Sequence, residues 1–233
     1  MIRVRGLVKT FGNTIALQEV DLDVAEGEFL TVVGANGAGK TTLIRLLATL
    51  SRPTAGEMRI SGLDPARDAV TIRRRIGMVS HQPLLYGDLS AVENLTFYGR
   101  MYDVSDLSRR IGELLDLVGL SARRNDAVRT FSQGMQQRLA IARAFLHDPV
   151  ILLLDEPFSG LDQQATAMLG QVLENTGSGR KRTVVMTTHD LGRGMSIGDR
   201  LVILARGRIV YQSRRDELDL ARLHAIYQSI STP

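Results

Sequence analysis

A glycine-rich stretch near the N-terminus constrains the fold of this chain more than any other feature. Residues 34–42 read Gly-Ala-Asn-Gly-Ala-Gly-Lys-Thr-Thr and lie between an apolar run and an amphipathic run. The pattern G-x-x-x-x-G-K-S/T is met, in the order strand, loop and helix that it requires, by Gly34, Gly39, Lys40 and Thr41. Such glycines let backbone N–H groups converge on a phosphate, and the N-terminus of the following helix adds positive potential.

We therefore predict a loop that binds the phosphates of a nucleotide. Lys40 would reach the outer phosphates, and Thr41 would hold Mg²⁺. The alternative is a flexible glycine turn in front of an ordinary helix. The residues predicted to contact the nucleotide here are Gly34, Ala35, Asn36, Gly37, Ala38, Gly39, Lys40, Thr41 and Thr42.

Composition bounds the class of protein. The 233 residues, 44% hydrophobic and 23% charged, suit one large domain or two small ones. The longest apolar run, Val150 to Leu154, is too short for a membrane helix, and the N-terminus does not resemble a signal peptide, so we expect a cytoplasmic protein. The chain has no cysteine and its four histidines lack ligand spacing, so we expect no structural metal. With a net charge of +4, 5% aromatics and no Trp, we expect no nucleic-acid partner.

The order of apolar patterns indicates an α/β core with a helical insert. Residues 1–33 predict a small antiparallel sheet that leads into a buried strand at 29–33. A helix with Leu43, Leu46, Leu47 and Leu50 on one side follows, then a stop at Pro53 and another strand. Strand patterns return at "VILLLD", "RTVVMTTHD" and "RLVILARGRIVYQ", the run 175–182 is typical of a surface connection, and the last twenty residues favour a short helix. We expect a single domain over 1–233, with an α/β core from 1–87 and 149–233 and a helical subdomain at 88–148.

Two adjacent acids follow the most apolar strand pattern. In "VILLLDEP", Asp155 and Glu156 end a buried strand, where a pair of carboxylates is unfavourable unless a cation lies nearby. A strand parallel to the one before the glycine loop would aim Asp155 at Mg²⁺ beside the nucleotide. Glu156 would then face the attacking water, and we hypothesise that it is the general base. The alternative is that two acids begin a loop by chance.

Taken together, the motifs of this chain resemble those of the nucleotide-binding subunit of ATP-binding cassette (ABC) transporters from end to end. "GANGAGKTT" is similar to the Walker A loop, "VILLLDEP" to Walker B and "FSQGMQQR" to the signature motif. "SHQP" places Gln82 where that family has its Q-loop glutamine, and "SGLD" resembles the D-loop. "MTTHD" places His189 at the position of the switch histidine. The order and spacing of all six are those of the family.

The resemblance implies a fold and a set of roles. The fold is a P-loop NTPase with a RecA-like α/β core, a small antiparallel β subdomain and an α-helical signature subdomain, and the cofactors are ATP and Mg²⁺. His189 would contact the γ-phosphate in catalysis, as Lys40 would, with a capped strand end as the alternative. Gln82 would contact Mg²⁺ or water and report the nucleotide state, with a turn residue before Pro83 as the alternative. Phe11 would stack on adenine in place of the usual tyrosine, with a core phenylalanine as the alternative. Asp162 would bridge the dimer interface, with a surface turn acid as the alternative.

The resemblance also implies partners. Two copies would dimerise head to tail, so that Ser132 and Gly134 of one copy contact the ATP of the other. A Ser132 N-cap would leave free N–H groups and a positive helix end for a γ-phosphate. The alternative is that Ser132 only caps the helix and has no role in phosphate binding, as is usual for an isolated serine cap. The usual L-S-G-G-Q is replaced by residues 131–135, Phe-Ser-Gln-Gly-Met. The serine and the second glycine remain, so we expect activity in spite of the changes at Gln133 and Met135.

The membrane partner and the cargo are less constrained. We expect the chain to lie peripherally on the cytoplasmic face of the cell membrane, bound to separate permease subunits. Some of the side chains of Leu84, Leu85, Tyr86 and Leu89 would form a groove for a permease helix, and the alternative is that they only pack the helical insert on the core. The stretch from "GMVSHQP", with His81 before Gln82, to "ENLTFYGRMY" resembles the haem exporters of cytochrome c biogenesis. The alternatives are a multidrug or polysaccharide exporter, a non-transport ABC ATPase acting on DNA or ribosomes, and an inactive regulatory cassette.

Overall fold

The structure is a computed structural model that describes residues 1–80, 82–161, 163–174 and 182–231. The predictions made for His81 and Asp162 lie outside the described residues, as does all but the last residue of the surface connection expected at 175–182.

A small antiparallel sheet forms at the N-terminus, as the sequence predicts. Its strands lie in the order β2-β1-β4 and comprise β1 (Ile2–Phe11), β2 (Thr14–Val24) and β4 (Ala55–Ile60). β1 and β2 form a hairpin over the turn at Gly12 and Asn13, where Gly12 has a φ of 55°. One face of β1 is apolar and buried, so this sheet packs on the rest of the molecule.

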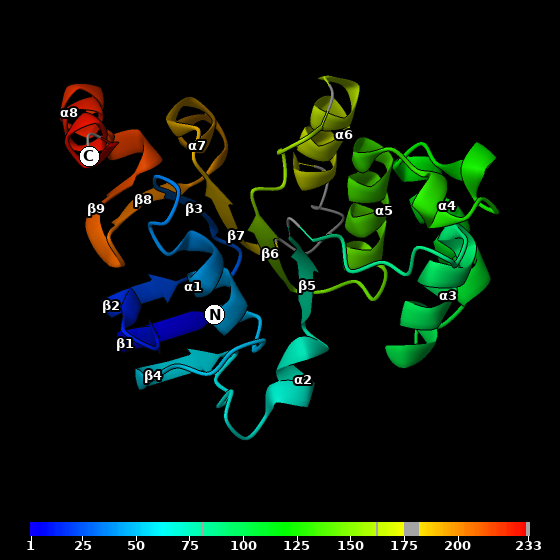
Figure 1. Ribbon diagram of the computed structural model, residues 1–233, viewed down its shortest axis with the longest axis horizontal. Helices are drawn as coiled ribbons and strands as arrows, with labels where there is room; N and C mark the ends of the chain where they lie inside the picture. The colour runs from blue at the N-terminus through cyan, green and yellow to red at the C-terminus, as the bar shows by residue number, and fades with distance from the viewer. Residues whose placement is uncertain (81, 162, 175–181, 232–233) are drawn as a thin grey trace.

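A six-stranded sheet forms the centre of the molecule (Figure 1). Its order is β5-β6-β7-β3-β8-β9, and the five strands from β5 to β8 are parallel while β9 is antiparallel to β8. The strands are β3 (Phe29–Val33), β5 (Ile76–Val79), β6 (Ile151–Asp155), β7 (Thr183–Thr188), β8 (Arg200–Ala205) and β9 (Arg208–Arg214). β6 is a continuous apolar run because both of its faces are covered. The parallel arrangement brings the carboxyl ends of β3, β6 and β7 to one edge.

Helices cover the central sheet on both sides. They are α1 (Lys40–Leu47), α2 (Ala69–Arg73), α3 (Ala91–Met101), α4 (Leu107–Leu117), α5 (Gln133–Phe145), α6 (Gln163–Glu174), α7 (Leu191–Ile197) and α8 (Leu220–Ser231), with short 3₁₀ helices at Ser121–Arg123, Val128–Thr130 and Arg215–Glu217. α3 and α4 lie at the end of the molecule opposite α8, with α5 between them and the sheet (Figure 1). No helix within the described ranges is both long and apolar enough to span a bilayer.

Three apolar clusters hold these layers together. The first joins the small sheet, α1 and one face of the central sheet. The second joins α3, α4, α5 and α6 to the other face. The third lies under α7 and α8 against β3 and β8, where Val33, Leu201, Ile203 and Leu223 are buried. The helical segment is therefore packed on the core through its own apolar cluster.

The structure corrects the sequence analysis at several elements. The helix after the glycine loop ends at Leu47, Thr49 takes a φ of 57°, and Leu50 leaves the apolar side and is 49% exposed. No sequence pattern had predicted α2, β5, α6 or α7. β5 has four residues and α2 has five, which is too short for a periodic apolar pattern to stand out.

Buried Asn94 fixes the loop that carries Leu84 to Leu89. Its Oδ1 accepts a hydrogen bond from the N–H of Tyr86 at 2.8 Å, and its Nδ2 donates to the carbonyls of Tyr86 (3.0 Å), Leu89 (3.3 Å) and Ser90 (3.0 Å). The Asn94 side chain is fully buried, and these contacts satisfy both its oxygen and its nitrogen. One amide thus ties the loop to α3.

Asn94→Ala should lower the stability of the chain substantially. The substitution removes the partner of the Tyr86 N–H and one of the donors to each of the three carbonyls, which keep their backbone donors. Each hydrogen bond lost is worth about 0.5–1.5 kcal/mol, and we expect a total loss of about 2–4 kcal/mol. The melting temperature should fall by roughly 5–15 °C, measured by circular dichroism. Thr96→Ala, which removes only a hydroxyl bonded to Val92 within the same helix, is the control. Equal melting temperatures for the two variants would contradict this account of the loop.

Candidate active site

The glycine loop connects the end of β3 to the start of α1 and needs glycine at two positions for steric reasons. A Cβ at Gly34 would lie 2.3 Å from the carbonyl oxygen of Leu204. Gly39 caps α1 with a φ of 107°, and a Cβ there would lie 2.5 Å from the carbonyl oxygen of Ala16. Gly39 is thus left-handed and crowded, a combination that excludes other residues. The loop therefore passes close to the neighbouring strands and opens toward the edge of the sheet.

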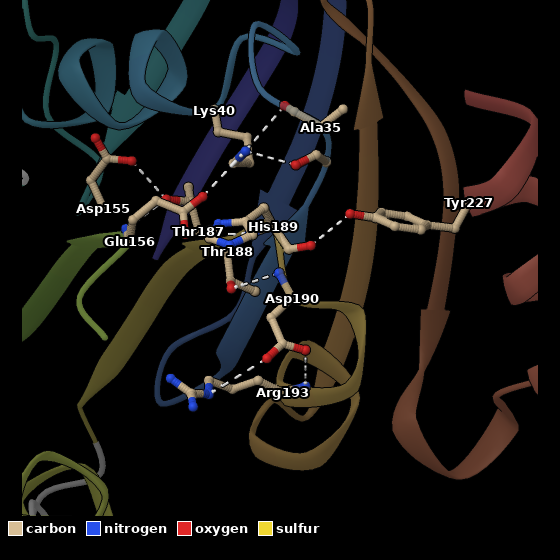
Figure 2. A network of polar contacts seen from close by, with 11 residues as sticks. Ala35, Lys40, Asp155, Glu156, Thr187, Thr188, His189, Asp190, Arg193 and Tyr227 are labelled. Carbon is tan, nitrogen blue, oxygen red and sulfur yellow. Dashed lines mark hydrogen bonds and ion pairs between the residues drawn. The ribbon is translucent and has the colours of Figure 1, made fainter. Parts of the chain in front are cut away.

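Lys40 is buried at the first turn of α1, directly behind this loop. Its Nζ donates to the carbonyl of Gly34 at 2.7 Å and to that of Ala35 at 3.1 Å, and lies 3.3 Å from Oε1 of Glu156 (Figure 2). Only 6% of the residue is exposed. Two backbone carbonyls of the glycine loop and one carboxylate therefore hold the positive charge at the mouth of the loop.

The two acids at the end of β6 are oriented by β7. Asp155, 2% exposed, accepts a hydrogen bond from the hydroxyl of Thr187 at 2.7 Å. The N–H of Glu156 contacts the hydroxyl (3.1 Å) and the carbonyl (3.2 Å) of the same Thr187. Glu156 takes a φ of 50°, a left-handed conformation that is uncommon for residues other than glycine. This turn aims its side chain toward β3 and α1.

His189 follows β7 and completes the cluster. Its Nδ1 lies 2.9 Å from Oε2 of Glu156, and its backbone N–H lies 3.3 Å from the same oxygen (Figure 2). Because a carboxylate only accepts, Nδ1 must carry the proton. The Glu156 carboxylate thus bridges Lys40 on one side and His189 on the other.

Asp155, Glu156 and His189 line a cavity of about 590 Å³, a size typical of small-molecule sites, which borders the glycine loop at Asn36 and the start of α1 at Thr41. Among the residues that the structure describes, its walls are formed by Asn36, Thr41, Arg45, Leu50, Met78, Ser80, Gln82, Leu84, Asp155, Glu156, Ser159 and His189. Arg45, Ser80 and Thr187 were not among the site residues predicted from the sequence. A signal existed for Thr187, because the strand "TVVMTT" interrupts its apolar pattern with threonines.

Some predicted residues lie outside this cavity. Phe11 ends β1 and is 55% exposed, with Nζ of Lys9 4.8 Å from its ring centroid, so it is not a core phenylalanine. Ser132 caps α5 by accepting a hydrogen bond from the N–H of Met135 at 3.2 Å. Gly134 lies in the first turn of that helix. A Cβ at this position would lie 3.7 Å from the carbonyl oxygen of Gly160, an ordinary van der Waals contact, so packing within the chain does not require glycine here. Ser132 is exposed and Gly134 half-buried, so this helix end faces outward.

The predicted metal ligands are all oxygen donors that line one cavity. A threonine hydroxyl (Thr41), an amide (Gln82) and a carboxylate (Asp155) suit Mg²⁺, which takes few protein ligands beside substrate phosphates. The described residues contain no group of three or more His, Cys, Asp and Glu side chains placed to hold a metal by themselves. The donor set therefore fits a magnesium ion shared with a phosphate.

A phosphate-binding loop, an acidic pair and a histidine at one edge of a parallel sheet define a P-loop nucleotide hydrolase. The sequence model of the family described as ABC transporter matches residues 17–159. The daunorubicin resistance ATP-binding protein DrrA3 of Streptomyces coeruleorubidus is 37% identical over 219 residues, covering 93% of this chain and 69% of that protein. The sulfate/thiosulfate import ATP-binding protein CysA 2 of Chromobacterium violaceum is 39% identical over 210 residues, covering 89% of this chain and 57% of that protein.

A solved dimeric ATP-binding cassette, in a post-hydrolysis state bound to ADP and Pi, matches the structure with a TM-score of 0.85 and 30% identity, over 92% of this chain and 99% of that one. The chain belongs to the ABC transporter family. It is a transport-coupled ATPase subunit with the nucleotide-binding domain fold that the sequence predicted.

Proposed function

We propose that two copies of this chain close head to tail around two ATP molecules and thereby drive export through separate membrane subunits. The observation that carries the proposal is the Glu156 carboxylate held between Lys40 and His189 beside the glycine loop. The solved dimer bound to ADP and Pi supports the two-copy arrangement by analogy. Residues 1–87 and 149–233 would act as the nucleotide-binding core and 88–148 as the helical subdomain.

In this proposal the chain binds and orients the triphosphate from several elements. The glycine loop and Lys40 bind its outer oxygens, and Thr41, Gln82 and Asp155 hold Mg²⁺, which neutralises phosphate charge. A phosphate oxygen that replaced Glu156 at Lys40 would free the Glu156 carboxylate to orient the attacking water and accept its proton. His189 would hold the γ-phosphate, and Phe11 would offer its exposed ring to adenine.

The start of α5 would serve the ATP of the second copy. The Ser132 hydroxyl caps the N–H of Met135, and Gly134 has no side chain, so a partner's γ-phosphate could approach the remaining backbone N–H groups at this helix end. The two departures from the usual signature have contacts within the chain. The side chain of Gln133 lies against Gly160, and Met135 packs on the second apolar cluster. Both are therefore compatible with the proposed interface.

Glu156→Gln should stop hydrolysis while preserving ATP binding. The amide keeps the shape of the side chain but cannot accept the proton of water, so the ATPase rate should fall about a hundredfold or more. ATP affinity should change by less than about threefold, and an ATP-dependent dimer should accumulate in light-scattering measurements. Glu113→Gln, in an exposed ion pair with Arg109, is the matched control. A near-normal rate in the Glu156 variant would refute the proposed role of this residue.

Exposed apolar side chains near the cavity form the proposed permease contact. Leu84, Tyr86, Phe97 and Met101 are 44–52% exposed, and the rings of Tyr86 and Phe97 meet edge to face at 5.1 Å. Leu85 packs instead on the helical cluster. Leu84 also lines the nucleotide cavity, so a membrane helix on this patch would lie one side chain from the site. Such contact would hold the chain peripherally at the cytoplasmic face of the membrane.

The cargo we propose is haem, on the basis of the stretch from "GMVSHQP" to "ENLTFYGRMY". A drug-like cargo is the second candidate, favoured by the likeness to the daunorubicin resistance protein. The complex purified from membranes separates the two, because a transporter's ATPase rate responds to its own cargo. Stimulation by haem supports the first candidate, and stimulation by daunorubicin alone supports the second.

Tyr86→Glu should detach the chain from that membrane complex without harming its own chemistry. A charge placed in the apolar patch opposes burial against a hydrophobic partner helix. Co-purification with the permease should be lost, while the ATPase rate of the isolated chain stays within about twofold. Val210→Glu, which charges a similarly exposed side chain on β9, should leave co-purification intact. Retained assembly in the Tyr86 variant would rule out this patch as the contact.

A further inference from the structure

The last described helix packs beside the catalytic cluster. Leu223, Ile226 and Tyr227 of α8 lie on the third apolar cluster, which includes Val33 at the end of β3 and Leu201 on β8. Val33 directly precedes the glycine loop. α8 therefore packs on the strand that carries the phosphate-binding loop, although it is remote from that loop in sequence.

One side chain of α8 reaches the catalytic residues themselves. The hydroxyl of Tyr227 donates to the backbone carbonyl of His189 at 2.6 Å (Figure 2). This distance lies within the range of a well-formed hydrogen bond between a hydroxyl and a carbonyl. The contact joins residues 38 positions apart and lies on the opposite side of His189 from Glu156.

His189 lies in a short turn between β7 and α7, formed by residues 188–190. The other hydrogen bonds of this turn join it to the nucleotide site, to α7 or to itself. The carbonyl of Thr188 accepts from the N–H of Gly34 at 3.3 Å, and its hydroxyl accepts from the N–H of Asp190 at 3.0 Å. Asp190 caps α7 by accepting from the N–H of Arg193 at 3.0 Å. The N–H of His189 donates to Glu156. Tyr227 thus supplies the partner for the carbonyl of the same residue whose imidazole meets Glu156.

Tyr227 is suited to remain a donor throughout the working pH range. Burial raises the pKa of its hydroxyl, and the negative charges of Glu156 and Asp190 raise the pKa further. The hydroxyl therefore keeps its proton at neutral pH, and the bond to His189 does not switch off with ordinary changes in pH.

We propose that Tyr227 is a positioning residue for ATP hydrolysis, acting through the backbone of His189. By fixing the carbonyl of His189, it sets the point from which the imidazole reaches Glu156 at 2.9 Å. The docking of α8 is thereby linked to the catalytic step and not to nucleotide affinity, which depends on the glycine loop and Lys40. This inference rests on the catalytic role proposed above for His189.

Tyr227→Phe is the direct test, because it removes one hydroxyl and keeps the ring in its apolar contacts. Loss of a well-formed hydrogen bond at the catalytic turn should lower kcat about three- to tenfold. KM for ATP should stay within about twofold, since the phosphate-binding groups are untouched. Tyr211→Phe, on the same apolar cluster but from β9, is the matched control and should leave both constants unchanged. A Tyr227 variant with the wild-type kcat overturns the proposal.

A double-mutant cycle with His189→Ala separates positioning from a general structural role. Alanine keeps the backbone carbonyl but removes the imidazole, so Tyr227→Phe should change the residual rate of His189→Ala by less than about 1.5-fold. The same fractional loss in both backgrounds would overturn the proposal while leaving the role of His189 intact. A His189→Ala variant with full activity would instead refute the proposed role of His189 and, with it, the positioning role of Tyr227.

A spectroscopic measurement tests the inference without turnover. The imidazole C–H signal of His189 can be assigned in the NMR spectrum by its loss in His189→Ala, since the chain has only four histidines. Tyr227→Phe should shift or broaden the His189 signal and leave that of His147, which stacks on Tyr102, in place. An unchanged His189 signal would contradict the positioning role.

Discussion

The structure of the site depends on a buried ammonium group. Lys40 is almost entirely removed from water, and a buried charge of this kind is tolerated only when acceptors surround it. Two of those acceptors are carbonyls of the glycine loop, and the third is a carboxylate from a strand more than a hundred residues away. The curvature of the loop, the turn after β6 and the position of His189 are all arranged around this charge.

The sheet order explains how that arrangement is achieved. β7 lies between β3 and β6, so its carboxyl end separates the glycine loop from the acidic pair and can contact both. Thr187 orients Asp155 and the backbone of Glu156, while Thr188 accepts from Gly34 of the loop. The strained backbone of Glu156 persists because these contacts and the ion pair over-determine it. One strand therefore sets the distance between the glycine loop and the acidic pair.

The sequence was informative wherever chemistry follows from local spacing. The glycine loop, the strand before it and the acids at the end of β6 could be predicted because each motif carries its own structural context. Contacts between distant elements could not be predicted in this way. The pattern of "TVVMTT" does not indicate that Thr187 contacts Asp155, and no local pattern indicates that Tyr227 contacts His189. Leu50 was wrongly placed because the apolar spacing continued after the helix ended at Leu47. The sequence allowed Phe11 to be either an adenine-stacking ring or a core phenylalanine, and only its exposure in the structure excludes the core. The roles proposed for Ser132 and Gly134 depend on a second copy, which one sequence cannot position.

Titration of Mg-ATP into a Lys40→Ala variant by calorimetry tests the central claim most directly. If the buried ammonium is the group that binds the outer phosphates, the variant should keep its circular dichroism spectrum but bind about a hundredfold more weakly, as expected for the loss of a charge-assisted contact. Binding of Mg-ATP by the folded variant with the affinity of the wild type would contradict the account.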